Sequence, residues 1–168
     1  MVASFLLYFI LLVFILLARM NDFFFYLVFF ILIFPLIVKK PEDIGLKNIK
    51  KGFFYGFLSS LIYFPFIWNN VSIYSFSQIG QVFGEELFFR GYLFNTLRIN
   101  NPHLKNIVIS GLFTIPHIIV YTNFLSALTF FPSLIFGYLY IRTGSIIAPA
   151  IFHLFSNIFF QNYLIHKL

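Results

Sequence analysis

Long apolar runs alternate with short polar segments along this chain. Residues 1–18 are apolar apart from Ser4, and a second apolar run, residues 23–38, follows a polar turn. An α-helix rises 1.5 Å per residue, so the first run would be about 27 Å long, close to the thickness of the hydrocarbon core of a bilayer. The pattern therefore predicts helices that span a membrane, and Pro35 predicts a kink in the second of them.

Five more runs follow, and together they predict an all-α fold, a polytopic transmembrane bundle of about seven helices around a buried polar active site. The third run ends at Trp68, a residue typical of membrane interfaces, and its Gly56, Ser59 and Ser60 form a small face for close helix packing. Pro102 predicts a helix stop in the loop 98–105. We expect one membrane-embedded domain, residues 1–168, whose remaining runs are residues 53–68, 79–97, 107–121, 124–141 and 145–160.

The first run has a second interpretation, a cleaved signal peptide. A signal peptide has a basic start and a cleavage site with small residues. This run has neither before Arg19, and a second apolar run follows at once. We therefore expect a membrane helix at the N-terminus.

Composition supports a membrane protein and excludes several kinds of site. Of the 168 residues, 61% are hydrophobic and only 10% are charged, which is far too apolar for a water-soluble domain. We expect a multi-pass integral protein of the cell membrane, in contact with lipid. Because the chain has no cysteine, disulfides, thiolate metal sites and cysteine nucleophiles are excluded.

The positive charge of the chain predicts its orientation in the membrane. The formal net charge is +6, but most Lys and Arg residues lie in short loops, so nucleic acid is not an expected partner. The loops at residues 39–51, 98–105 and 142 hold eight of them, and the opposite side holds only Arg19 and Lys167. Cytoplasmic loops carry such an excess. The bias predicts a cytoplasmic N-terminus and an external C-terminus.

The fourth run contains three charged residues, Glu85, Glu86 and Arg90. A charged side chain at the centre of a membrane helix costs about 2.5–3.5 kcal/mol on insertion scales, so such residues usually face a polar interior and have a function. Glu86 and Arg90 are four residues apart and are expected to pair. Glu85, desolvated and beside a like charge, is then a candidate general base.

Two other runs carry polar residues at the same depth. At 1.5 Å per residue, Glu85 lies about 9 Å below the start of its helix, His117 about 6 Å below the end of the fifth, and His153 about 10 Å below the end of the seventh. The fourth helix runs antiparallel to the other two, so these residues are level. Asn157 is four residues after His153 and is expected to pair with it. The pattern predicts one buried polar site.

The residues alone leave two further interpretations open. The Glu–Arg pair and the histidines are also the kind of polar groups that join membrane helices structurally. Alternatively, the carboxylates could form a proton relay in a transporter.

The order and spacing of the motifs resemble the CPBP family, which comprises CAAX proteases and bacteriocin-processing enzymes and is also called the ABI or type II CAAX endopeptidase family. The resemblance covers about residues 79–158, the motif-bearing core, whereas residues 1–78 match only as generic membrane helices. The motifs are Glu-Glu-x-x-x-Arg-Gly from Glu85, Phe113-Thr114-Ile115-Pro116-His117, the segment from Gly137 to Ser145, and His153-x-x-x-Asn157.

The resemblance implies an intramembrane endopeptidase that cuts prenylated CAAX proteins near the C-terminus. By motif, Glu85 would be the base that activates water, and His117 would position and polarise the water. His153 and Asn157 would stabilise the oxyanion, while Glu86 and Arg90 would hold the site together. Alternatives are a peptidase for other membrane or leader peptides and a non-enzymatic immunity or scaffold protein.

A zinc-dependent version of the same chemistry is a further alternative. Glu85, His117 and His153 are a ligand set that zinc uses in hydrolases. The sequence lacks His-Glu-x-x-His, however, and the three ligands would come from separate helices. We therefore favour catalysis by glutamate, with no metal or other cofactor.

The predicted topology and the predicted substrate disagree about the side of the membrane. The charge bias places the level of Glu85, His117 and His153 nearer the outer face, whereas a protease for prenylated cytosolic proteins should open to the cytoplasm. Either a loop is misassigned, for example through a re-entrant piece within residues 69–78, or the site opens deeply or laterally. A third possibility is that the substrate is not a CAAX protein.

Overall fold

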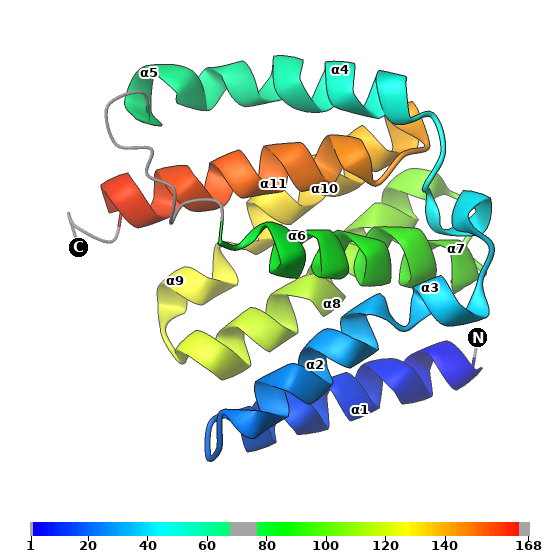
Figure 1. Ribbon diagram of the computed structural model, residues 1–168, viewed down its shortest axis with the longest axis vertical. Coiled ribbons are helices and arrows are strands. Elements are labelled where there is room, and N and C mark those ends of the chain that lie inside the picture. Colours follow the sequence, from blue (N-terminus) through cyan, green and yellow to red (C-terminus); the bar gives the residue numbers. More distant parts are fainter. Residues whose placement is uncertain (1, 68–76, 165–168) are drawn as a thin grey trace.

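The computed structural model describes residues 2–67 and 77–164, and these are helices joined by short turns, without a strand. They form seven successive helical rods that lie side by side (Figure 1). The prediction of an all-helical fold is confirmed, and each apolar run corresponds to one rod. The rods are α1 (Val2–Ala18); α2 (Phe23–Ile33) with α3 (Pro35–Val38); α4 (Ile49–Ser60) with η2 (Leu61–Tyr63) and α5 (Phe64–Ile67); α6 (Ile79–Glu86) with η4 (Leu87–Leu93) and α7 (Phe94–Thr96); α8 (Pro102–Tyr121); α9 (Phe124–Ala127) with α10 (Phe130–Thr143); and α11 (Ile147–Phe159) with η5 (Phe160–Leu164).

The fourth rod, α6–η4–α7, lies in the middle of the bundle. It contacts α2 on one side and α11 on the other, while α4 covers the far side of α11 and α1 covers α2 (Figure 1). Burial of a polar segment costs less free energy where other helices supply partners than where it faces an apolar environment. The one strongly charged apolar run of the sequence is therefore the one that the other helices surround.

Several predicted boundaries were wrong, and local chemistry explains the largest error. Pro102 does not stop a helix but is the first residue of α8, where the missing N–H is no loss. The side chain of Asn101 caps this helix by accepting hydrogen bonds from the backbone N–H groups of His103 and Leu104. The fifth helix thus begins five residues before the predicted 107. The third rod also begins earlier, at Ile49, while the predicted interface residue Trp68 and residues 69–76 of the polar loop lie outside the described residues.

Two prolines shape the rods as their chemistry requires. Pro35 starts the short helix α3, and the break at Phe34 confirms the kink predicted in the second run. Pro116 stands inside α8 and has no N–H for the carbonyl of Leu112 four residues earlier. The hydroxyl of Tyr8 donates to that carbonyl at 2.8 Å instead. The first rod therefore satisfies the backbone next to His117.

The small face of α4 lets this helix approach α11 closely. Gly52, Gly56 and Ser60 are buried on one side of α4. A Cβ atom at Gly56 would lie only 2.9 Å from the carbonyl oxygen of Ala148 and 3.0 Å from Cβ of Ile151. The predicted packing role of Gly56 and Ser60 is confirmed, whereas Ser59 is only half-buried and bonds back to its own helix.

Large apolar side chains cover much of the outside of the bundle. Examples are Phe9 at 62% exposure on α1, Phe30 at 63% on α2 and Phe54 at 63% on α4. Extended apolar surface of this kind marks a protein or membrane contact. Within the described residues, the two helices long and apolar enough to cross a membrane are Pro102–Tyr121 and Phe124–Thr143, and the apolar helices Val2–Ala18 and Phe23–Val38 are shorter.

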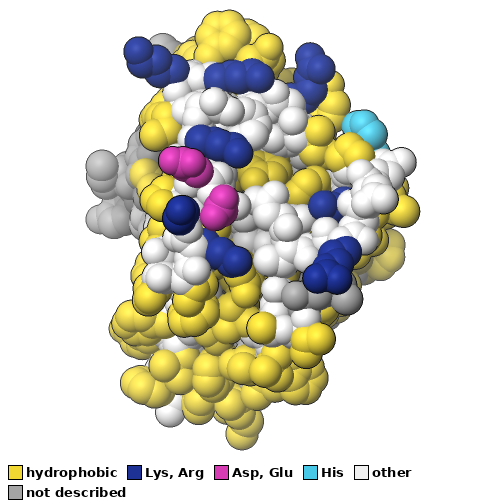
Figure 2. Space-filling view, turned by 90° about the vertical axis from the view of Figure 1, so that its right-hand side faces the viewer, with side chains coloured by type: hydrophobic (Ala, Val, Ile, Leu, Met, Phe, Trp, Pro, Cys, Tyr) yellow, Lys and Arg dark blue, Asp and Glu magenta, His cyan; other side chains and the backbone are white. Residues whose placement is uncertain are grey.

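One end of the bundle is basic. Figure 2 shows Lys and Arg side chains gathered on this end, which carries α3 and α7 and lies at the right of Figure 1. We call it the basic end, and it consists of residues 39–51, residues 98–105 and Arg142. The three loops that the charge count assigned to one side thus do share one end of the molecule.

The packing of α4 on α11 predicts how two glycines differ. Gly56→Ala should lower the free energy of unfolding by roughly 1–3 kcal/mol, because the new methyl group overlaps the backbone of Ala148. Gly111→Ala is the matched control, because nothing lies within 4 Å of its added Cβ, and it should be neutral or stabilise the helix by up to about 1 kcal/mol. Denaturant unfolding of both variants in detergent micelles measures the difference. Equal effects would contradict this packing.

Candidate active site

The fourth rod brings the charged residues of the sequence into the centre of the bundle. Glu85 and Glu86 end α6, and Arg90 lies in η4, which is π-helical. π-Helical segments are rare and frequently occur at functional sites. Because α6 contacts α11 and η4 contacts α8, this rod faces the two helices that carry His153 and His117. The sequence pattern did not foresee the π-helical geometry.

Glu86 and Arg90 form a fully buried ion pair, as predicted. Arg90 Nη1 lies 3.1 Å from Glu86 Oε1, and both side chains are 0% exposed. The other guanidinium nitrogen, Nη2, donates to the backbone carbonyl of Ser133 at 3.1 Å and to its hydroxyl. A buried charge needs a partner and further hydrogen bonds to offset its desolvation, and these contacts supply both.

Glu86 also orients His153. Its Oε1 atom accepts a hydrogen bond from His153 Nδ1 at 2.9 Å. The other ring nitrogen, Nε2, then points toward Glu85, with 3.8 Å to Glu85 Oε2. One carboxylate oxygen thus holds both the arginine and the histidine, and the histidine presents its second nitrogen to the neighbouring glutamate.

Two phenylalanines form the walls around these charges. Phe136 stacks on the ring of His153, with 4.4 Å between ring centroids. The guanidinium carbon of Arg90 lies 4.5 Å from the centroid of Phe113 and 5.2 Å from that of Phe136, which is within the range of cation–π attraction. These rings keep the rotamers of Arg90 and His153 fixed.

His117 joins the site from α8. Its Nδ1 atom lies 2.9 Å from the carbonyl oxygen of Phe113. Because a carbonyl only accepts, Nδ1 carries the proton and the neutral ring keeps Nε2 as an acceptor. The ring packs against Phe113 with 4.6 Å between centroids, and Phe113 also contacts His153. His117 is half-buried and lies within electrostatic range of Glu85 and His153.

Asn157 differs from its prediction. Its amide does not pair with His153, four residues earlier; instead, Nδ2 donates to Gln78 Oε1 at 3.1 Å. His153 turns to Glu86 because a buried carboxylate is the stronger partner. Asn157 is half-buried, and its second amide hydrogen is not used by Gln78. The helix spacing correctly placed both residues on one face but did not identify their partners.

The structure adds polar residues that sequence reasoning missed. Gln81 Nε2 donates to Glu85 Oε1 at 2.8 Å, one helical turn before the glutamate. The spacing of four residues could have identified Gln81, as it identified the pair of Glu86 and Arg90. Ser133 offered no such signal, because it lies in another apolar run and meets Arg90 only in the folded bundle.

The residues proposed as zinc ligands do not converge as a metal site. Among the described residues, no group of three or more His, Asp or Glu side chains is arranged so that it could hold a metal ion. His117 and His153 both use Nδ1 on protein groups, a carbonyl and a carboxylate respectively. Such bonds at Nδ1 are usual for metal-ligating histidines and leave Nε2 free, so it is the spacing of Glu85, His117 and His153, and not these bonds, that gives no metal-holding group among the described residues.

Glu85 and Glu86 differ in access. Glu86 is 0% exposed, whereas Glu85 retains 9% of its surface. Glu85 lies six residues, or about 9 Å, from the start of α6, and α5, α9 and the end of α11 extend beyond this start on the side away from the basic end (Figure 1).

These features describe an all-helical protein with a buried cluster of carboxylates and histidines. A family model, the Rce1-like type II CAAX prenyl endopeptidase, matches residues 3–159. The chain belongs to this family, so the resemblance read from the sequence motifs is confirmed and now extends to the first three rods. No curated protein and no solved structure matches the chain. Family membership indicates a protease acting on a peptide substrate and, with the two long apolar helices, a membrane protein.

The buried ion pair predicts a large loss of stability when one partner is removed. Arg90→Ala leaves the carboxylate of Glu86 buried without its cation and should lower the free energy of unfolding by roughly 3–5 kcal/mol. Ser133→Ala removes one hydroxyl while the carbonyl bond to Arg90 remains, and should cost less, about 1–2 kcal/mol. Denaturant unfolding in micelles measures both. A loss below 1 kcal/mol for Arg90→Ala would show that Arg90 does not hold this site.

Proposed function

We propose that this protein is a membrane-embedded endopeptidase in which Glu85 activates a water molecule to cut a peptide bond near the C-terminus of a prenylated CAAX-type protein. The observation that carries the proposal is that the two glutamates differ in their exposure and in their partners. Glu86 is fully buried and occupied by Arg90 and His153, whereas Glu85 has exposed surface and faces His153 Nε2. Family membership supplies the class of reaction.

In this proposal Glu85 takes a proton from water, and the oxygen attacks the carbonyl carbon of the substrate. His117 Nε2 accepts a hydrogen bond from the same water and orients it, because Nδ1 is bonded to Phe113. Gln81 fixes the glutamate through Oε1, which leaves Oε2 for the water. A positioned base of this kind contributes about 10²–10⁴-fold to rate.

The oxyanion needs hydrogen-bond donors. We assign this role to His153 and to the free amide hydrogen of Asn157. His153 presents Nε2 on the side of Glu85, while Nδ1 stays bonded to Glu86. When the C–N bond breaks, the proton held by Glu85 passes to the leaving amine, so protons balance. Glu86 and Arg90 are positioning residues that hold His153.

The proposal includes seven membrane-spanning rods. The exposed apolar surfaces of α1, α2 and α4 support it, because in water they would be a continuous hydrophobic patch. The basic end supports a cytoplasmic position for that end. Glu85 then lies nearer the outer face, so a prenylated substrate would reach it from within the bilayer.

Substitution of the proposed base is the first test. Glu85→Gln should lower the rate of cleavage of a farnesylated CAAX peptide roughly 10²–10⁴-fold and leave the unfolding transition nearly unchanged. Glu42→Gln, an exposed carboxylate at the basic end, is the matched control and should cleave normally. Product formation is followed by mass spectrometry, with an unprenylated peptide as a second substrate.

Undiminished cleavage by Glu85→Gln would disprove the role of Glu85 as base. Cleavage of a leader peptide but not of either CAAX peptide would disprove the proposed substrate but not the proposed mechanism. Proton flux in liposomes that depends on Glu85, without any peptide product, would show that the protein is a transporter and not a protease. Neither activity would favour an immunity or scaffold protein.

Labelling of single introduced cysteines tests the orientation of the protein in the membrane. The chain has no cysteine of its own that would react with the label. Asn100→Cys marks the basic end, and Met20→Cys, 85% exposed in the wild type, marks the opposite end. A membrane-impermeant maleimide should label Met20→Cys on intact cells and Asn100→Cys only after lysis. The reverse pattern would invert the topology. Ser75, in the polar loop, would be a further position but lies outside the described residues.

A further inference from the structure

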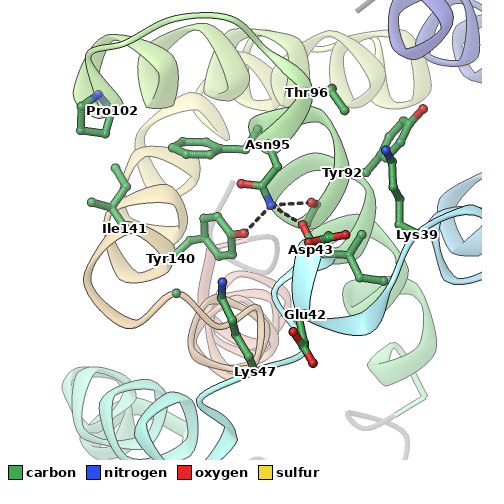
Figure 3. Close-up of a pocket in the computed structure, with 14 residues that line it drawn as sticks. Lys39, Glu42, Asp43, Lys47, Tyr92, Asn95, Thr96, Pro102, Tyr140 and Ile141 are labelled. Carbon is green, nitrogen blue, oxygen red and sulfur yellow. Dashed lines mark hydrogen bonds between the residues drawn. The ribbon is translucent and has the colours of Figure 1, made fainter.

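A second polar pocket lies at the basic end, away from the catalytic residues. Its volume is about 600 Å³, within the range of small-molecule sites. The walls come from the loop after α3, from η4 and α7, and from the ends of α8 and α10 (Figure 3). The charged and polar side chains of its lining include Lys39, Glu42, Asp43, Lys47, Asn95 and Tyr140.

The pocket is held open by a rigid wall. Asn95 Nδ2 donates to the carbonyl oxygen of Asp43 and to the hydroxyl of Tyr140, at 2.8 and 2.7 Å (Figure 3). The backbone N–H of Ile146 donates to the carbonyl of Gly45, which has a positive φ of 75°. Gly91 lets the loop approach, because a Cβ there would lie 2.5 Å from the carbonyl oxygen of Ile44. A preformed pocket binds its ligand without a cost for ordering the loop.

The charges around the pocket have both signs. Lys39 and Lys47 supply two cations, and Glu42 and Asp43 supply two anions. Within residues 2–67 and 77–164, none of these four side chains takes part in an ion pair. Lys47 points toward the hydroxyl of Tyr140, and the carbonyl of Asn95 remains available as an acceptor (Figure 3). The pocket thus offers donors for a phosphate and acceptors for an ammonium group.

The surroundings indicate a lipid. Lys39 follows directly on α3, whose Ile37 is 79% exposed, and Pro102 begins α8, whose Leu104 is 51% exposed. The pocket therefore lies where the charged end meets exposed apolar helix surface. In a membrane protein this is the level of the phospholipid phosphates, where pockets between helices bind head groups.

We propose that this pocket binds the head group of a phospholipid that carries a primary amine, of the phosphatidylethanolamine type. The phosphate lies at Lys47 and the Tyr140 hydroxyl, and the ammonium group donates to Asp43, which Figure 3 shows on the neighbouring side of the pocket. The equal number of cations and anions fits a zwitterion better than a purely anionic head group. This inference rests on the proposed membrane embedding but not on the peptidase activity.

Native mass spectrometry of the detergent-purified protein tests the proposal. The protein is offered equimolar phosphatidylethanolamine, phosphatidylcholine and phosphatidylglycerol with matched acyl chains. Phosphatidylethanolamine should be retained roughly two- to fivefold over the other two, the range expected from one or two partly exposed ion pairs. Asp43→Asn should remove the preference, whereas Lys47→Ala should lower the retention of all three lipids, because each of them carries the phosphate. Lys39→Ala is a second cation variant, and all three change exposed side chains, so folding should be unaffected.

Matched controls separate the pocket from general charge. Lys51→Ala changes a lysine of the basic end that does not line the pocket, and Asp22→Asn changes an acid at the opposite end; both should keep the preference. Equal retention of phosphatidylethanolamine and phosphatidylcholine would overturn the proposal. So would a preference for phosphatidylglycerol that Lys47→Ala removes and Asp43→Asn does not.

Competition with a water-soluble head-group compound distinguishes a lipid ligand from a small phosphate ester. Glycerophosphoethanolamine at the same concentration should not displace the lipid, because it lacks the acyl chains that lie on α3 and α8. Displacement would show that the pocket binds a soluble phosphate ester and would overturn the assignment to a lipid. Purification of the protein without detergent would instead disprove membrane embedding itself, independently of any binding result.

Discussion

The side chain of Glu86 is the point on which the interior of this bundle depends. One of its oxygens, Oε1, accepts from both Arg90 and His153, at 3.1 and 2.9 Å, in a place with no exposed surface. A carboxylate in such a place would be very costly alone, and a guanidinium equally so. Each is tolerated because the other is present, and the aromatic walls of Phe113 and Phe136 then pack against the paired charges. Four helical rods are tied together by this one group: the fourth holds the pair, and the fifth, sixth and seventh supply Phe113, Ser133 with Phe136, and His153.

The fourth rod contacts both the buried charged cluster and the loop before α4, because successive residues of a helix point about 100° apart. Arg90 points inward to Glu86 and Ser133, while Gly91 faces the loop before α4 and lets the carbonyl of Ile44 approach. Four residues later Asn95 bonds to that loop and to Tyr140. The Arg-Gly step of the motif therefore has two physical reasons, one in the catalytic cluster and one in the wall of the pocket at the basic end. A substitution at Gly91 would move the loop and the pocket without touching a reacting group.

The sequence predicted the elements and the pairs within one helix, because these follow from local rules. The apolar runs gave the rods, spacing by four residues gave the pair of Glu86 and Arg90, and antiparallel depth brought Glu85, His117 and His153 to one level. Contacts between helices could not be predicted from these local rules. The preference of His153 for Glu86, of Asn157 for Gln78 and of Arg90 for Ser133 depends on which rods are neighbours and how they are rotated. The prediction for Pro102 was wrong because a proline can either follow the end of a helix or stand at the start of one. The cap formed by Asn101 shows that Pro102 stands at a start.

The two glutamates show how adjacent residues of one type acquire different roles. In a helix, neighbours point about 100° apart, so Glu86 is fully buried while Glu85 keeps 9% of its surface exposed. Glu86 is fully buried, and its bonds with Arg90 and His153 give it a structural role. Among the described residues, Gln81 is the hydrogen-bond partner of Glu85, and Glu85 Oε2 lies 3.8 Å from His153 Nε2. The base role proposed for Glu85 requires access to a substrate, and of the two glutamates only Glu85 keeps any exposed surface.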